Sequence, residues 1–396
     1  MWVIEFVILT YFIYVVGYTT IFSLAGFFYR LPDPQNSELK RFCIFIPCYK
    51  EDRVILDVAS KALCQKQFPH THYTVVVIAD SLQQSTLQAL RSLPIKVIEV
   101  QFELSTKVKA LNFALNAIEE PYDYAVILDA DNVMEENFLV RMNSVMNPDS
   151  IAVQGQRKPK NKNNALSILD GVSEAINNHI YRQGTVALGM SSAISGSGVA
   201  FHYQTLKKHL ATMTSIGGFD RELELLLLRD GYKVKYLKSA VVYDEKVSQS
   251  DVFQNQRKRW IFSQYYYLGK YFGEGIHALL KGNFAFFNSA VLRNIQLPRL
   301  INLGLITLIT LGFYFIQNWL AFGYLVWIIL FTLNAIAIVV AIPRELFSKD
   351  LGAAIFQIPG IFLKMFTLLF KLGGANKKFI HTPHTYQHSD NSQKHK

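Results

Sequence analysis

The stretch Val126-Ile127-Leu128-Asp129-Ala130-Asp131-Asn132 decides the fold class of this chain. Its three apolar residues are typical of a buried strand. Two carboxylates then follow at the C-terminal edge, where open α/β sheets bind their ligands. Residues i and i+2 of an extended chain point to the same side, so Asp129 and Asp131 can face one site. Such a pair suits Mg²⁺ or Mn²⁺ shared with ligand phosphates. The alternative interpretation is an Asp-rich turn after a strand.

Composition narrows the classes of function. The chain has 396 residues, a net charge of +10, 51% hydrophobic residues and a mean hydropathy of +0.17. It contains no helix-turn-helix, zinc-finger or RNP-like pattern, so we expect no nucleic-acid partner and assign the basic charge to a membrane surface. Cys43, Cys48 and Cys64 show neither metal-site spacing nor a disulfide framework, which indicates a reducing compartment.

The N-terminal stretch is almost wholly apolar, with Glu5 as its one charged residue. It lacks the basic start and small-residue cleavage site of a signal peptide, and it is long enough to cross a bilayer. We therefore expect residues 1–29 to be an uncleaved transmembrane anchor. By the positive-inside rule the following domain is cytoplasmic, because basic residues come next; these are Arg30, Lys40, Arg41 and Lys50. The expected location is the cell inner membrane.

Apolar residues dominate again from Leu297 onwards. We expect residues 297–343 to form a transmembrane hairpin, because two apolar runs are separated by three residues, Gln317-Asn318-Trp319. Residues 351–372 contain polar and proline interruptions, so they predict an interfacial segment, a re-entrant segment or a third span. Residues 381–396 predict a flexible tail. Its histidines are explained more simply by solvation than by metal binding.

Residues 41–272 have the pattern of a soluble α/β domain. Apolar runs alternating with helical patterns predict a mostly parallel sheet with helices on both faces. Polar side chains stand where the first two strands and the strand before Asp129 end, and parallel strands end at one edge of a sheet. A shared site at that edge follows. The expected strands span 42–46, 73–79, 95–100, 151–157, 234–237 and 240–243; the expected helices span 52–65, 107–119, 165–182 and 221–229.

Three further stretches carry chemistry-bearing residues. Ser195-Gly196-Ser197-Gly198 predicts a loop whose glycines allow close backbone approach to a ligand. Asp220 precedes a leucine-rich helix, and capping of that helix is the alternative to a chemical role. Gln256-Arg257-Lys258-Arg259-Trp260 belongs to a basic, aromatic helix. A helix of this kind also suits a membrane surface.

These motifs together resemble the membrane-embedded family 2 glycosyltransferases, similar to cellulose, chitin and hyaluronan synthases. The resemblance covers roughly residues 41–260 by motif and the apolar flanks by layout. It implies a GT-A fold, which has a Rossmann-like, mostly parallel sheet. The matching segments are Ile46–Glu51, Asp80, the K-x-x-A-L-N element Lys107–Asn112, the D-x-D element Asp129–Asp131, the glycine loop Ser195–Gly198, and Gln256, Arg259 and Trp260 of Q-x-x-R-W.

The resemblance also implies residue roles. Asp220 is the expected catalytic base, although the family's T-E-D is replaced here by I-G-G-F-D. The spacing from Asp220 to Gly231 keeps the family register, and Glu222 and Glu224 are the alternatives. Asp129 and Asp131 are the expected ligands of Mg²⁺ or Mn²⁺. The expected nucleotide-sugar residues are Pro47, Tyr49, Glu51, Asp80, Lys107, Asp129, Asp131 and Arg259, and the expected acceptor residues are Ser197, Gly198, Gln256 and Trp260.

The implied activity is a metal-dependent, inverting transfer from a nucleotide-sugar, a UDP-hexose or UDP-N-acetylhexosamine. The Q-x-x-R-W element is associated with processive members, so the expected acceptor is a growing polysaccharide. Alternatives are a lipid acceptor, a catalytically silent scaffold of a polysaccharide-export complex, and a transport protein with a nucleotide-sensing domain. Few spans follow the catalytic region, so a secretion channel formed by one chain would be narrow or would need a second copy of the chain or an export partner.

Overall fold

The computed structural model describes residues 2–34, 38–215 and 217–371. One mixed α/β domain carries an eight-stranded sheet with the strand order β3-β2-β1-β4-β7-β6-β8-β5. The strands are β1 (Phe42–Tyr49), β2 (Tyr73–Asp80), β3 (Lys96–Val100), β4 (Tyr124–Ile127), β5 (Val133–Met134), β6 (Ala152–Pro159), β7 (Val199–His202) and β8 (Val234–Asp244).

The sheet is mostly parallel, as the sequence predicts. Strands β3, β2, β1 and β4 pair in parallel, and β6 pairs in parallel with β8. Strands β7 and β5 run opposite to their neighbours. The carboxyl ends of β1, β2 and β4 therefore meet at one edge. That edge faces the long helix α10 (Ser250–Leu280).

Helices cover both faces of the sheet because the strand residues are apolar on both sides. Along β1, Phe42, Ile44 and Ile46 pack under α2, α3 and α5, whereas Cys43 and Phe45 pack under α4, α8 and α9. The helices of this domain are α2 (Ile55–Leu63), α3 (Gln84–Arg91), α4 (Lys107–Ala117), α5 (Phe138–Val145), α6 (Ala165–Asn177), α7 (Thr185–Ala187), α8 (Tyr203–Ala211) and α9 (Phe219–Arg229).

Several boundaries differ from the sequence-based expectation. The two short strands expected at 234–237 and 240–243 form the single strand β8. Its register against β6 jumps from Leu237 to Val241, so a bulge absorbs the intervening residues. The helix expected at 165–182 ends at Asn177 and continues as a π-helix, η2 (Asn178–Gly184), in which Arg182 bonds Glu174 and Asn178. The helix expected at 52–65 spans Ile55–Leu63.

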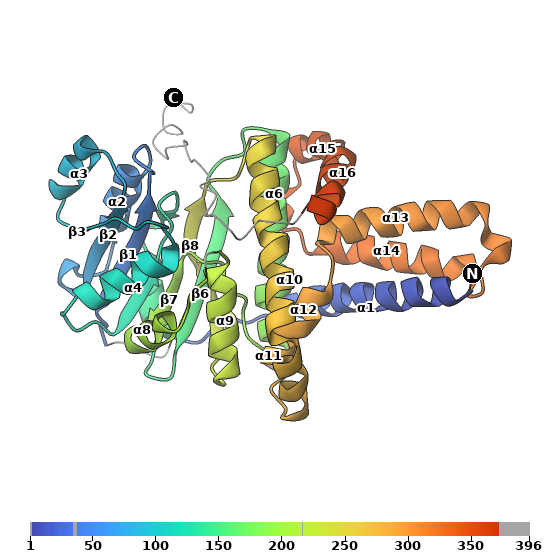
Figure 1. Cartoon of the computed structure of the whole chain (residues 1–396), viewed down its shortest axis with the longest axis horizontal. Coiled ribbons are helices and arrows are strands. Elements are labelled where there is room, and N and C mark those ends of the chain that lie inside the picture. The colour runs from blue at the N-terminus through green and yellow to red at the C-terminus, as the bar shows by residue number, and fades with distance from the viewer. Residues whose placement is uncertain (1, 35–37, 216, 372–396) are drawn as a thin grey trace.

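Helix α10 (Ser250–Leu280) separates the sheet domain from a group of apolar helices (Figure 1). It lies across the direction of those helices. They are α1 (Trp2–Gly26), α13 (Arg299–Phe315) and α14 (Tyr324–Val340). The shorter elements near them include α11 (Phe284–Phe287), η3 (Asn288–Leu292), α12 (Arg293–Ile295), α15 (Lys349–Ile355) and α16 (Ile358–Leu368).

Among the described residues, α1 is the one helix that is long and apolar enough by itself to cross a membrane. Two bent pairs pass the same test when each is counted as one span: residues 284–315, bent by 51°, and residues 349–371, bent by 49°. Helix α14, in the expected 297–343 hairpin, is shorter, with 17 residues. The tail expected at 381–396 lies outside the described residues.

Helix α1 packs closely against both the sheet domain and the apolar hairpin. A Cβ added to Gly184 of η2 would stand 2.1 Å from the carbonyl oxygen of Phe22, so the two backbones touch there. Near its start, the Glu5 carboxylate accepts hydrogen bonds from the backbone N–H groups of Ala321 and Phe322 and from the Trp327 indole. The apolar helices are thus tied to the α/β domain through α1.

Candidate functional site

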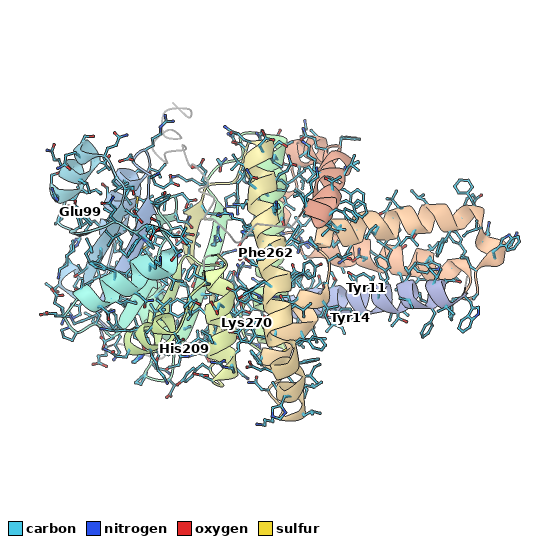
Figure 2. The ribbon with its side chains drawn as sticks, viewed as in Figure 1. Tyr11, Tyr14, Glu99, His209, Phe262 and Lys270 are labelled. Atoms are coloured by element: carbon cyan, nitrogen blue, oxygen red, sulfur yellow. The ribbon has the colours of Figure 1, made fainter. Side chains whose placement is uncertain are left out.

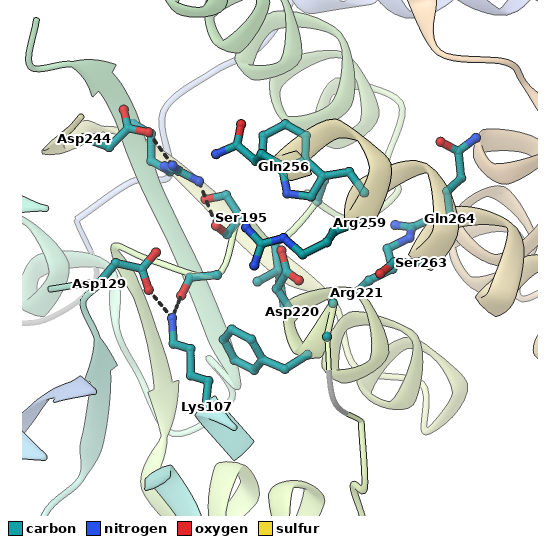
Figure 3. Close-up of a pocket in the computed structure, with 18 of the residues that line it drawn as sticks. Lys107, Asp129, Ser195, Asp220, Arg221, Asp244, Gln256, Arg259, Ser263 and Gln264 are labelled. Carbon is teal, nitrogen blue, oxygen red and sulfur yellow. Dashed lines mark hydrogen bonds and ion pairs between the residues drawn. The ribbon is translucent and has the colours of Figure 1, made fainter. Parts of the chain in front are cut away.

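A cavity of about 580 Å³ lies between the carboxyl edge of the sheet and helix α10 (Figure 3). Its walls come from the ends of β1, β2 and β4, the start of α4, the loop before β7, the start of α9, helix α10, and the break between α12 and α13. The expected site residues that line it are Pro47, Tyr49, Glu51, Asp80, Lys107, Asp129, Asp131, Asp220, Gln256, Arg259 and Trp260.

The ends of β1 and β2 form one wall. Asp80 is the last residue of β2, and its backbone carbonyl accepts a hydrogen bond from Lys50 just beyond β1. Ser81 donates to the Asp80 carboxylate. Asp80 and Glu51 are both buried. This wall therefore presents fixed carboxylates beside the apolar surface of the sheet edge.

The loop after β4 brings both carboxylates of the D-x-D element to the cavity. Strand β4 ends at Ile127, so Asp129 and Asp131 lie in the turn beyond it. The Asp129 backbone N–H donates to Ser197 Oγ at 2.9 Å, which fixes the turn against the glycine loop. Asn132 donates to the Asp131 carboxylate. The Asp-rich turn that follows the strand is therefore also part of the cavity wall.

Lys107 connects three parts of the site. Thr106 caps α4 by accepting from the backbone N–H of Lys109, so the helix begins at Lys107 and its side chain enters the cavity. The Lys107 ammonium pairs with Asp129 and donates to the Gly196 carbonyl at 2.8 Å (Figure 3). It also lies 4.5 Å from the centre of the Phe219 ring.

The structure places Ser197 and Gly198 behind the cavity wall and not among its lining residues. Ser197 is fully buried. Gly198 has a φ of +63°, and a Cβ there would stand 2.6 Å from Val242. These two residues hold the loop against the sheet, while Ser195 and Gly196 of the same loop face the cavity.

Asp220 lies on the opposite wall from Asp129, in the first turn of α9. The N-cap of that helix is Gly218, with a φ of +68°, so Asp220 does not cap it. Burial raises the pKa of the Asp220 carboxyl, and the Lys107 ammonium partly offsets this rise. The side chain points toward Arg259 of α10 in Figure 3. Asp220 is therefore a half-buried carboxylate with strengthened basicity.

The two alternative bases are engaged elsewhere. Glu222 pairs with Lys270, at 2.5 Å. Glu224 is 1% exposed and accepts hydrogen bonds from four groups: the Ile194 backbone, Arg221, Ser289 and Arg293. Neither glutamate lines the cavity. Their contacts join α9 to Ile194 just before the glycine loop, to α10 and to the elements after α10.

Helix α10 supplies the third wall through Gln256, Arg259 and Trp260. Burial lowers the pKa of the Arg259 guanidinium. Trp260 is 47% exposed, and Arg257 stacks on its ring at 4.2 Å while pairing with Asp170 of α6. The Gln256 Oε1 atom is buried without a hydrogen-bond partner in the described structure.

Sequence reasoning missed a group of charged residues on the same cavity wall. Asp244 ends β8 at the edge that also carries Asp80, and it pairs with Arg157 and Lys246. The signal was present in the sequence, since Asp244 follows an apolar run, as Asp129 does. Because β8 was expected as two short strands, Asp244 was not identified as the end of a long strand at this edge. The other charged lining residues that were missed are Asp170, Glu174, Arg182, Arg221, Glu245, Arg293 and Arg299.

The chemistry of this donor set fits a divalent cation that is shared with a ligand. In residues 2–34, 38–215 and 217–371, no group of three or more His, Cys, Asp or Glu side chains is placed to hold a metal alone. Asp129 and Asp131 nevertheless present hard oxygen donors to the cavity, and Asp129 already attracts the Lys107 ammonium. Carboxylates supplemented by ligand phosphates are a usual Mg²⁺ environment.

One solved structure shares the fold over nearly the whole chain. The mannosyltransferase PcManGT from Pyrobaculum calidifontis, solved with GDP-Man and Mn²⁺, matches 93% of this chain and 97% of its own, with 16% identity and a TM-score of 0.57. TarS from S. aureus with UDP-GlcNAc matches 53% of this chain and 60% of its own, with 16% identity and a TM-score of 0.38. The first match shows a shared GT-A fold.

Sequence comparison supplies the family. No curated protein matches the chain in sequence. A family model described as glycosyltransferase like family 2 matches residues 40–263, more than half of the chain. That segment contains the sheet, the D-x-D turn, Asp220 and the Q-x-x-R-W residues. The chain therefore belongs to the family 2 glycosyltransferases.

Proposed function

We propose that the chain transfers a sugar, with inversion, from a UDP-sugar to an acceptor hydroxyl held at a membrane surface. One observation carries the proposal. A single cavity has the D-x-D carboxylates on one wall and a carboxylate of raised pKa, Asp220, on the opposite wall. In an inverting transfer the diphosphate leaves from one side of the reacting carbon and the acceptor hydroxyl attacks from the other. The carboxylates that serve the diphosphate and the base that serves the hydroxyl are therefore required on opposite sides of that carbon.

The donor end of the cavity is the sheet edge. Pro47, Tyr49, Glu51 and Asp80 surround the nucleoside in this proposal. Asp129 and Asp131 hold the divalent ion, which supplies charge stabilisation to the diphosphate leaving group. Lys107 and Arg259 are the cations assigned to the diphosphate in this proposal, and a guanidinium can make two hydrogen bonds to phosphate oxygens.

Asp220 is the proposed general base. It takes the proton from the acceptor hydroxyl as that oxygen attacks the anomeric carbon from the side opposite the diphosphate. A carboxylate with a raised pKa is a stronger base than an exposed one, so its burial favours proton transfer. Glu222 and Glu224 hold α9 in place through their ion pairs and hydrogen bonds.

The acceptor end lies against α10, where Trp260 offers an aromatic face and Gln256 offers an amide. A growing polysaccharide is the acceptor that the Q-x-x-R-W element favours. A lipid-linked acceptor is the second candidate, and the described apolar helices favour it. They include one helix of spanning length, or three spans if each bent pair counts as one, which is few for enclosing a polymer channel.

Membrane attachment through α1 completes the proposal. Helix α10 carries the proposed acceptor residues and lies across the apolar helices (Figure 1). In this proposal it therefore brings the cavity to the bilayer surface. The basic residues after α1 favour a cytoplasmic domain at the cell inner membrane. A second copy of the chain or an export partner would be needed if the product is a secreted polymer.

The test is metal-dependent donor binding in detergent by wild type, Asp131→Ala and the control Asp149→Ala, whose aspartate is exposed. We expect Mn²⁺-dependent UDP affinity in wild type and control and its loss in Asp131→Ala. Unchanged affinity in Asp131→Ala would contradict the assigned role. The donor panel should include GDP-mannose beside UDP-sugars, because PcManGT was solved with that donor. A protein that binds no nucleotide would instead be the silent scaffold.

A further inference from the structure

The cavity has a second end, remote in sequence from the D-x-D turn, at the break between α12 and α13. Residues Asn294, Gln296, Leu297, Pro298 and Arg299 line it there. We propose that this end is an anion subsite, built on Arg299, for the phosphate of a lipid-linked acceptor. The inference rests on the proposed function, because it assigns the acceptor of the same cavity.

Arg299 is a fixed cation with unused hydrogen-bonding capacity. Its Nη2 atom donates to the carbonyl and the hydroxyl of Ser173 on α6, each at 3.1 Å. Its Nη1 atom is buried and has no acceptor in the described part of the chain. Leaving a buried donor unpaired is unfavourable because its desolvation is not compensated, so a native structure that keeps one requires an explanation. An anion bound at the cavity end would supply it.

The neighbouring carboxylates do not neutralise Arg299. Asp170 and Glu174 line the same cavity, but Asp170 pairs with Arg257 and Glu174 pairs with Arg182. Within residues 2–34, 38–215 and 217–371, Arg299 itself forms no ion pair. The local charge balance therefore leaves this guanidinium available to a negatively charged ligand.

The start of α13 adds a second source of positive potential. Pro298 occupies the N-cap and gives no side-chain cap to the helix. The N-terminal end of a helix carries a partial positive charge and free N–H groups, and anions bind at such ends. Pro298 and Arg299 both border the cavity, so the dipole and the guanidinium act on the same volume.

Helix α1 holds this break in a fixed shape. The Leu297 backbone N–H donates to the Tyr11 hydroxyl at 2.9 Å, and the Gln296 amide donates to the Tyr14 hydroxyl at 3.4 Å. Figure 2 shows both tyrosines on α1. A site whose backbone is held in advance loses less entropy when its ligand binds. The subsite is therefore built partly by the membrane anchor.

The position of Arg299 favours the phosphate of a lipid over a soluble phosphate. Arg299 is the first residue of the apolar helix α13, which packs with α14 and, through it, with α1. A phosphate at Arg299 would leave an attached hydrocarbon chain beside those apolar helices, while a sugar on the phosphate would extend into the cavity toward Asp220. The phosphate is bound and does not react; the sugar hydroxyl is the nucleophile.

The experiment measures binding of farnesyl phosphate, farnesol and inorganic phosphate to the full chain in a neutral detergent, with UDP binding measured in parallel. The proteins are wild type, Arg299→Gln, and Arg91→Gln, in which the altered arginine is an exposed residue paired with Glu99. We expect farnesyl phosphate to bind wild type and the control equally and Arg299→Gln about tenfold or more weakly, as for loss of a charged hydrogen bond. UDP affinity should be the same in all three.

Three other outcomes would overturn the inference. Equal farnesyl phosphate affinity in wild type and Arg299→Gln removes Arg299 from the subsite. Loss of UDP affinity in Arg299→Gln would assign Arg299 to the donor site. Inorganic phosphate binding as tightly as farnesyl phosphate would indicate a soluble anion. If Arg299→Gln does not fold, the test is the comparison of two ligands on the wild-type protein. Farnesol, which lacks the phosphate, must then bind more weakly than farnesyl phosphate. Absence of UDP binding in wild type would contradict the proposed function separately.

Discussion

Gly196 lies directly against Asp220, the proposed base. A Cβ added to Gly196 would stand 3.4 Å from the Asp220 Cβ and 3.5 Å from its Oδ2. The carbonyl of Gly196 also accepts a hydrogen bond from Lys107, which pairs with Asp129. One glycine therefore contacts both Lys107, which the proposal assigns to the donor, and Asp220, which it assigns to the acceptor.

Gly196→Ala should lower kcat strongly, and its effect on the free energy of unfolding should be modest. Gly196 has a φ of +78°, which is unfavourable for alanine by about 1–2 kcal/mol. Relief of that strain would move the loop away from Asp220 and Lys107, so we expect kcat to fall about tenfold or more. Gly231→Ala is the matched control, since Gly231 has a φ of +85° and open space around it. Kinetics and thermal unfolding of both variants test this; equal turnover losses would contradict the role of Gly196.

Lys107→Met should weaken UDP binding by about tenfold, as expected when one charge-assisted hydrogen bond to a phosphate is lost. Lys109→Met is the control on the same helix. The Lys109 ammonium bonds the Leu104 carbonyl, and Lys109 does not line the cavity. Calorimetric titration with UDP and Mn²⁺ separates the two variants. Similar affinities in both would remove Lys107 from the donor site.

Activity should rise with pH through the pKa of Asp220. A base must be deprotonated to accept a proton, and burial raises the pKa of this carboxyl above its ordinary value. The acidic limb of kcat/KM is therefore expected at a higher pH than the usual value for aspartate, about 3.9. The Lys107 ammonium lowers the pKa of Asp220. In Lys107→Met, the acidic limb of the remaining kcat/KM should therefore move to still higher pH. A shift toward lower pH would be the opposite of this prediction.

Glu5→Ala should loosen the apolar helices and leave the donor site intact. The substitution removes the acceptor of three hydrogen bonds from Ala321, Phe322 and Trp327 and leaves those donors unpaired. We expect a loss of about 2 kcal/mol or more in stability, seen as a lower Tm in detergent, with UDP affinity unchanged. Glu345→Ala, at an exposed position, is the control. An unchanged Tm in Glu5→Ala would show that this contact does not hold α1 in place.

The sheet and its edge were predictable because they depend on local patterns. Apolar runs identify β1, β2 and β4, and the polar residues that end them identify the donor wall. Parallel strands bring such ends together whatever the details of packing. The same rule applied to the end of β8 would have identified Asp244.

Long-range contacts were not predictable in this way. Nothing in the sequence around Glu224 indicates that it binds Ile194, Ser289 and Arg293, because those partners lie on three other segments. The close approach of Gly184 to α1 likewise depends on two helices far apart in the chain. Ser197 and Gly198 were assigned to the acceptor by motif alone, and the structure has them buried behind the residues that line the cavity.

The role of Asp220 as general base is tested most directly by measuring transfer by Asp220→Asn with UDP-sugar and Mn²⁺ in detergent, beside UDP binding by the same protein. We predict unchanged UDP affinity and a loss of transfer of at least about 100-fold, the lower end of what a general base contributes. Transfer at the wild-type rate by Asp220→Asn would contradict that role, and the base would then have to be sought elsewhere in the cavity.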